Sequence, residues 1–266
     1  MAMTDTVSEN VFNLQSLLNA SRVRAFLVHL GISLSVFSIL LYLILYHWYP
    51  QPFFVANGGW QGLRIIVFVD VVLGPLLTAI VYKPGKPGLA IDLGIIALFQ
   101  ISALLWGLYV IAGQRPVLVV FTLNRLYSVP ASDLPATGLS PNQIRRFGPG
   151  IPILYSKIPG DPDAKLALLT KSLKTGLPLH LMGNLYEALD AETLEKVKSA
   201  SININGLTNE SVEQKRRIKR FLAQHHAAAD RFAYLPLLCS YREILVALDL
   251  RTKTIAGALD IPIPAN

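Results

Sequence analysis

The stretch "IIVFVDVVLGPLLTAIVYKPGKPG" (residues 65–88) sets the architecture expected for this chain, because it belongs to an apolar run that is long enough to cross a bilayer. Near the middle of the apolar run it carries an aspartate, Asp70, and a proline, Pro75. A carboxylate is costly inside hydrocarbon, and a proline removes one hydrogen bond from a helix. If the run spans a membrane, a neighbouring group must make both residues tolerable.

The composition separates a membrane part from a soluble part. The chain has 266 residues, of which 52% are hydrophobic and 15% charged, whereas soluble domains carry about 25% charged residues. Only five of the 24 Lys and Arg residues and four of the 17 Asp and Glu residues lie in residues 1–112. We therefore predict an N-terminal segment (1–24), a membrane domain (25–112) and a soluble domain (113–266) large enough to bury its own core.

Three apolar runs reach the length of about 20 residues that a transmembrane α-helix needs. They are residues 25–48, 63–82 and 89–112. The turn KPGKPG (83–88) is so short that the last two spans must be neighbours. Before the first span, residues 11–26 place leucines at helical spacing, which is typical either of an interfacial helix or of a frayed terminal tail.

The distribution of Lys and Arg predicts the orientation of the spans. Arg22 and Arg24 precede the first span and Lys83 and Lys86 lie in the turn, whereas the loop 49–62 has no Lys or Arg. Cytoplasmic loops are richer in these residues. We therefore expect a cytoplasmic N-terminus and an outer C-terminal domain, which in a bacterium means an inner-membrane protein with a periplasmic domain.

The polar residues of the second span share one helix face. Asp70, Gly74 and Thr78 are four residues apart, which suits close approach by a second helix, and Pro75 is expected to kink the span. Gln100 lies in the middle of the third span, where it can hydrogen-bond Asp70 or a guest helix. Three interpretations remain open: a contact among the protein's own helices, a docking face for another protein's helix, and proton or ion transport.

The soluble part alternates between helix and strand signals. The predicted helices, with N-cap residues such as Ser140 and Asp161, are 140–147, 161–173, 190–200 and 209–226. The predicted strands are 116–121, 232–240, 242–250 and 254–261, of which the last two form a hairpin. The expected fold is three N-terminal transmembrane α-helices followed by a soluble α+β domain with a small antiparallel sheet.

Signatures of enzymes and of metal or phosphate sites are missing from the sequence. GxSxG, GxxxxGK[ST] and HExxH do not occur. The basic run KRRIKR (215–220) is expected to be the solvated face of a helix, and an outer location argues against nucleic acid as its partner. Adjacent His225 and His226 point about 100° apart on a helix and are not expected to bind a metal. The lone Cys239 is expected to be a small buried hydrophobe. We predict no catalysis and no cofactor.

Several segments carry a resemblance to a known family. They are RVRAFLVHLGISL (22–34), WYPQPFF (48–54), the block from 69 to 110 that contains DVVLGPLLT and KPGK, RPVLVVF (115–121), and 232–260. In these segments the chain resembles the type IV pilin accessory proteins (TfpX/TfpZ type), with DVVLGPLLT and KPGK the most specific part. Residues 1–20 extend beyond the segment where members of that family are expected to begin.

The resemblance implies an inner-membrane assembly factor that binds its cognate type IV major pilin and promotes pilus assembly without catalysing a reaction. Before assembly, such pilins are held in the membrane by one apolar helix, and their globular head lies outside. We hypothesise that the pilin helix docks against Asp70, Gly74, Pro75, Thr78 and Gln100, while the outer domain recognises the head. The alternative is a small transport or ion-conducting subunit that uses Asp70.

Overall fold

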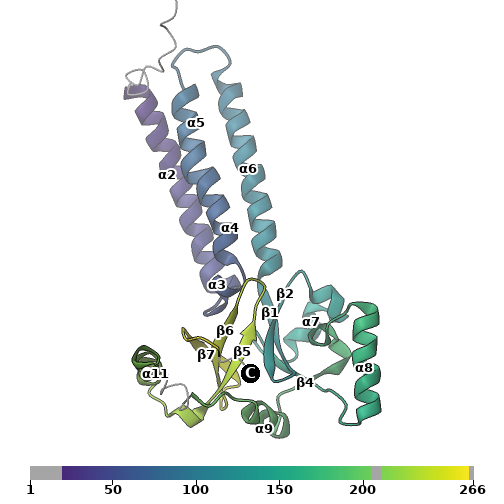
Figure 1. Cartoon of the computed structure of the whole chain (residues 1–266). Coiled ribbons are helices and arrows are strands. Elements are labelled where there is room, and N and C mark those ends of the chain that lie inside the picture. Colours follow the sequence, from purple (N-terminus) through teal and green to yellow (C-terminus); the bar gives the residue numbers. More distant parts are fainter. Residues whose placement is uncertain (1–19, 205–210, 264–266) are drawn as a thin grey trace, which may run out of the picture. The chain divides into compact units, whose positions relative to one another are not determined.

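The computed structural model describes residues 20–204 and 211–263 (Figure 1). The chain divides into two compact units. Residues 20–43 and 61–110 form one, which we call the helical unit; residues 44–60 and the chain from 111 onward form the other, the sheet unit. The predicted interfacial helix at 11–26 lies largely outside the described residues.

Among the described residues, three helices are long and apolar enough to cross a membrane. They are α2 (Ala20–Leu43) continued by η1 (Ile44–Trp48), the continuous run of α4 (Gly59–Ile66), η2 (Val67–Leu73) and α5 (Gly74–Val81), and α6 (Leu89–Gln114). All three predicted spans are thus helical, although α2 begins five residues before the predicted start of the first span. The turn between α5 and α6 is closed by a hydrogen bond from Lys86 N–H to the Lys83 carbonyl.

Pro75 is accommodated by a π-helical segment. The seven residues of η2 immediately precede the α5 residues Gly74 and Pro75, and the Gly74 N–H bonds to the carbonyl of Val69, five residues back. A proline has no N–H to donate, and its ring crowds the carbonyl four residues before it. The wider π turn relieves this conflict. The irregularity expected at Pro75 is therefore a change of helix type that includes Asp70.

The sheet unit is built on one seven-stranded mixed sheet with the strand order β4-β3-β1-β2-β5-β6-β7. Its strands are β1 (Pro116–Thr122), β2 (Arg125–Pro130), β3 (Ile153–Ser156), β4 (Tyr186–Ala188), β5 (Phe232–Leu238), β6 (Glu243–Asp249) and β7 (Thr254–Leu259). The prediction of a small antiparallel sheet is wrong, because β1 pairs with β3 and β2 with β5 in parallel. Short strands such as β3 and β4 carry too little alternation to be predicted. The four predicted strands and the β6–β7 hairpin are confirmed.

The four predicted helices of this unit are also confirmed. They are α7 (Pro141–Arg145), α8 (Pro162–Thr175), α9 (Ala191–Ser199) and α11 (Val212–Gln224). Ser140 and Gln143 form the predicted capping box of α7, and the Asp161 carboxylate accepts from the Ala164 N–H at the start of α8. The local sequence therefore fixes where these helices begin.

Two apolar clusters hold the helices to the sheet. One lies among β1, β2 and β3 and includes Leu118, Val129 and Leu154 together with Ile144 of α7. In the other, Ile218 and Phe221 of α11 pack against β5, β6 and β7. The inward position of these two side chains confirms that the basic run 215–220 presents most of its charges outward, as its helical spacing predicts.

The end of the first membrane helix, η1, and the connection to the second fold as part of the sheet unit. The connection contains α3 (Phe53–Ala56). Asn57 is completely buried; its amide donates to Ser128 Oγ at 2.9 Å and accepts from the Ser240 N–H at 3.2 Å. The Tyr49 hydroxyl donates to the Ile111 carbonyl at 2.6 Å. The loop that the sequence assigns to the membrane domain is thus anchored by polar bonds to the sheet.

Candidate partner-binding groove

The polar stripe of the second span packs inside the helical unit. Asp70, Gly74, Pro75 and Thr78 are all buried, and the α5 and η2 segments that carry them lie against α2. Thr78 Oγ1 hydrogen-bonds His29 Nδ1 across this contact at 2.6 Å. The second helix that the stripe approaches is therefore α2 of the same chain.

The residue spacing of α2 matches that stripe. Ser21, Ala25, His29 and Ser33 recur every fourth residue of α2 and place small or polar side chains on one face. Two such faces let helices approach closely and exchange hydrogen bonds. His29 was not among the predicted site residues; this period of four around a histidine inside a span is the signal that identifies it.

Gln100 of α6 lies over Gly74. Its side-chain Nε2 donates to the backbone carbonyl of Asp70 at 3.4 Å, and a Cβ atom at Gly74 would overlap the Gln100 amide. Gly74 is thus required for the close approach of Gln100. The predicted link between Gln100 and Asp70 exists, but it joins Gln100 to the backbone of Asp70 and not to its carboxyl group.

One oxygen of the Asp70 carboxyl group has no hydrogen-bond donor among the described residues. The residue is 8% exposed, and its Oδ1 atom has no hydrogen-bond partner among the described residues. A buried oxygen without a donor destabilises the fold and is rare in native proteins. Asp70 therefore offers an acceptor that the protein's own helices leave unused.

An open groove of about 720 Å³ lies in the helical unit between α2, the end of α5 and α6. Small side chains widen it, with Ala25 on one wall and Ala97 on the other. His29 and Thr78 supply its polar lining. Of the five predicted docking residues, only Thr78 lines this groove; the other four are not among its lining residues.

Basic residues gather at one end of the helical unit. Arg24 lines the groove, and Arg22 Nε donates to the Tyr82 carbonyl at 2.9 Å, which joins the start of α2 to the end of α5. Lys86, in the turn after α5, forms an ion pair with Asp92 at 2.6 Å. The cations that predict a cytoplasmic end therefore belong to a single end of this unit.

The remaining candidate residues of the sequence analysis are His225 and Cys239. His225 packs on the Phe221 ring and contacts the Ala256 carbonyl. Cys239 is half-buried and not fully buried as predicted, and desolvation raises the pKa of its thiol to about 12, which disfavours a reactive thiolate. Within residues 20–204 and 211–263, no three His, Cys, Asp or Glu residues are grouped to hold a metal ion.

Comparisons with known proteins place the chain in a family. Residues 19–58 match the family described as "Fimbrial assembly protein FimB". The "Fimbrial assembly protein, serogroup I" of Dichelobacter nodosus is 28% identical over 257 residues, which cover 94% of this chain and 98% of the relative. The "Fimbrial assembly protein, serogroups C1 and C2" of the same organism is 36% identical over 124 residues, or 46% of this chain and 93% of the relative. No solved structure matches.

These similarities confirm the resemblance drawn from the motifs around Asp70 and the turn at 83–88. The serogroup I relative is matched along nearly its whole length, and the serogroups C1 and C2 relative exceeds one third identity over most of its length. The chain belongs to the family of fimbrial assembly proteins, a type IV pilus accessory family.

Proposed function

We propose that this protein is a pilin-specific, chaperone-like assembly factor that binds its cognate type IV major pilin in the bacterial inner membrane and promotes pilus assembly. The observation that carries the proposal is the open groove of the helical unit, in a chain whose relatives are named fimbrial assembly proteins. The apolar helix of a membrane-inserted pilin is the occupant that the family resemblance implies.

The lining of the groove suits a transmembrane helix. Helices associate in lipid through close packing at small residues and through hydrogen bonds between them. Ala25 and Ala97 leave space for a helix, and the His29–Thr78 pair places polar atoms within it. Asp70, Gly74, Pro75 and Gln100 do not line the groove but shape the neighbouring helix surfaces, and Asp70 Oδ1 is a buried acceptor that no described residue uses.

The proposal includes an orientation in the membrane. The basic end of the helical unit, with Arg24 and Lys86, lies in the cytoplasm, in accordance with the excess of Lys and Arg on that side. The sheet unit then lies in the periplasm, where it contacts the globular head of the pilin. Reporter tags fused at Asn266 and inserted in the turn at 83–88 should show opposite locations.

Filling the groove tests the intramembrane contact most directly. Ala25→Phe and Ala97→Phe add bulk to the two walls without removing any hydrogen bond, and we expect both to abolish co-purification of the cognate pilin from membranes. Leu98→Phe is the matched control, because Leu98 is 64% exposed on α6 and does not line the groove. Undiminished pilin recovery with a correctly inserted Ala25→Phe protein contradicts docking in this groove.

A second pair of variants tests Asp70. Since no described residue donates to Asp70 Oδ1, Asp70→Leu should leave the helical unit folded. If the pilin helix uses this oxygen, Asp70→Leu loses pilin and Asp70→Asn, which keeps one acceptor oxygen, retains part of it. If the parent, Asp70→Leu and Asp70→Asn proteins all recover the same amount of pilin, Asp70 is not part of the docking site.

The unpaired carboxyl oxygen also favours one alternative function, a small ion-conducting or transport subunit. It predicts a proton-coupled flux in proteoliposomes that disappears in Asp70→Asn. The pilin-binding proposal predicts no such flux.

A further inference from the structure

The sheet unit contains one end of each of the three membrane helices. The first of these helices ends at Trp48, the second begins at Gly59 and the third ends at Gln114. All three positions belong to the sheet unit, which comprises residues 44–60 and the chain from 111 onward. Where these helices leave the hydrocarbon, the surrounding surface of the sheet unit lies at the level of the lipid head groups. Side chains on that surface can contact phospholipid.

The loop between β5 and β6 belongs to this surface. Its Ser240 N–H donates to Asn57 Oδ1 at 3.2 Å, and its Tyr241 N–H donates to the Ala56 carbonyl at 3.1 Å. The Tyr241 ring covers Gly58 so closely that a Cβ atom at Gly58 would overlap it. Tyr241 is nevertheless 54% exposed. The loop therefore presents a partly exposed aromatic side chain next to the residues from which the second membrane helix begins.

Arg115 lies in the same region of the sheet unit, directly after the end of the third membrane helix. Its guanidinium carbon is 5.8 Å from the centre of the Trp48 ring. Arg115 and Tyr241 both interact electrostatically with the hydroxyl of Tyr49, which donates to the Ile111 carbonyl. Arg115, Trp48 and Tyr241 thus lie together around Tyr49, and we call these three residues the span-end cluster.

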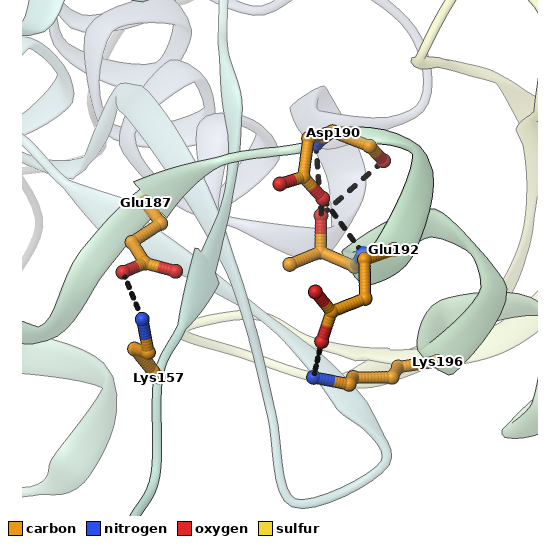
Figure 2. A network of polar contacts seen from close by, with 6 residues as sticks. Lys157, Glu187, Asp190, Glu192 and Lys196 are labelled. Atoms are coloured by element: carbon orange, nitrogen blue, oxygen red, sulfur yellow. Dashed lines mark hydrogen bonds and ion pairs between the residues drawn. The ribbon is translucent and has the colours of Figure 1, made fainter.

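The guanidinium group of Arg115 has no carboxylate to balance its charge. Two lysines of the sheet unit show the usual arrangement: Lys157 pairs with Glu187 at 2.8 Å and Lys196 with Glu192 at 2.7 Å (Figure 2). Arg115 is half-buried, yet it forms no ion pair within the part of the chain that the structure describes. Since buried charges are normally paired, an anion from outside the chain is the expected partner of Arg115.

The anion that is abundant at the ends of membrane helices is the phosphate of a phospholipid. A guanidinium group binds phosphate through two parallel hydrogen bonds. Trp and Tyr are enriched at the level of the head groups, because each combines an apolar ring with a polar N–H or O–H group. Arg242, the residue after Tyr241, is exposed and forms no ion pair with any described residue. Two unbalanced cations favour an anionic over a zwitterionic lipid.

We propose that the span-end cluster binds the head group of an anionic phospholipid. Arg115 donates to the lipid phosphate, and the rings of Trp48 and Tyr241 lie among the head groups. The contact holds the β5–β6 loop against the membrane surface. This site goes beyond the proposed function: it lies within the sheet unit and needs no pilin, so it can fail while docking in the groove holds.

Native mass spectrometry of the full chain tests the site, with phosphatidylglycerol as the anionic probe and phosphatidylcholine as the zwitterionic one. Arg115→Gln should weaken the binding of phosphatidylglycerol about tenfold, as expected for loss of a charge-assisted contact, and Arg115→Lys should weaken it less. Arg251→Gln is the matched control, because Arg251 is exposed in the turn after β6, at the opposite end of that strand from Tyr241. Unchanged binding in Arg115→Gln overturns the proposal.

The two probes and inorganic phosphate separate the possible ligands. The parent protein should retain phosphatidylglycerol in preference to phosphatidylcholine, and equal retention of both overturns the anionic preference. Inorganic phosphate at the concentration of the lipid should not displace it. Displacement under these conditions shows a site for free anions and overturns the lipid assignment.

A spin label measures the position of the loop independently of lipid affinity. Cys239→Ala removes the lone cysteine, and Ser240→Cys then carries the label beside Tyr241 without changing the span-end cluster. In phosphatidylglycerol vesicles, this label should collide less often with a water-soluble nickel complex than a label at Arg251→Cys. Equal collision rates at the two positions place the loop in water and overturn the proposal.

Discussion

Asn57 ties the loop between the first two membrane helices to the sheet, and its replacement by alanine gives a quantitative test of that attachment. The change removes the bond to Ser128 Oγ and the bond from the Ser240 N–H, at 2.9 and 3.2 Å. Each bond contributes about 0.5–1 kcal/mol net, and the gap left by a fully buried amide adds about 1–2 kcal/mol. We expect a loss of about 2–4 kcal/mol from the stability of the sheet unit.

Hydrogen exchange measured by mass spectrometry on the full chain in detergent reports this loss. A change of 2–4 kcal/mol accelerates exchange through opening of the unit by roughly 30- to 700-fold. The amides of β2 and β5, which carry or adjoin the two partners of Asn57, should show it. The amides of α2 and α5 should not change and serve as the internal control.

Ser128→Ala provides the matched comparison, because it removes one of the two bonds and leaves the Asn57 amide without an acceptor. The double variant Asn57→Ala with Ser128→Ala should lose less than the sum of the two single losses. Acceleration below threefold in Asn57→Ala would refute the claim that this residue fastens the loop to the sheet.

Three further predictions concern the sheet unit. At pH 8 the Cys239 thiol, whose pKa desolvation raises from 9.0 to about 12, should react with iodoacetamide about a thousandfold more slowly than in the unfolded chain, and stability should fall as pH rises above 9; rapid labelling of the folded protein contradicts the raised pKa. Asp249→Ala should cost about 3 kcal/mol in thermal unfolding, because Arg231 Nε and Nη2 donate to this 4%-exposed carboxylate at 2.9 and 2.6 Å. Burial alone would raise the pKa of Asp249, but the bonds from Arg231 and from backbone N–H groups lower this pKa below 3.8. The stabilisation that the Asp249 carboxylate provides is therefore present above pH 3.8 and is lost as the pH falls below that value. A difference in stability between Asp249→Ala and the parent that does not depend on pH contradicts this assignment. Thr122→Val should raise the stability of the sheet unit by about 1 kcal/mol, since it removes a buried hydroxyl without a partner, and a loss of similar size in β1 exchange would show that the hydroxyl is paired.

Local patterns in the sequence predicted the elements better than their arrangement. The three apolar runs gave the membrane helices, and cap residues such as Ser140 and Asp161 gave the starts of α7 and α8. The mixed sheet was missed because β3 and β4 are short and because parallel pairing between β1 and β3 joins segments that only the folded chain brings together.

The candidate sites show the same division. The polar stripe at Asp70, Gly74 and Thr78 was visible from its spacing, but its packing against α2 depends on a matching face that includes His29. The adjacency of Thr122 and Ser156, two buried hydroxyls without a partner among the described residues, could not be predicted, because only the sheet register sets them side by side. The spacing of residues along the chain identifies which of them share a face of one helix or strand. A site built from several elements depends also on how those elements pack together, and the spacing does not show this.

The π-helical turn before Pro75 decides where the second membrane helix can lose a residue. Such a turn holds one residue more than an α-helical turn, so deletion of a single valine between Asp70 and Gly74 would let the helix return to ordinary winding. The turns on either side would keep their phase, and Thr78 would still face His29. A deletion between Pro75 and Thr78, where no wide turn absorbs it, would instead rotate the residues beyond it by about 100°, which turns Thr78 away from His29 and moves Tyr82 off the groove wall.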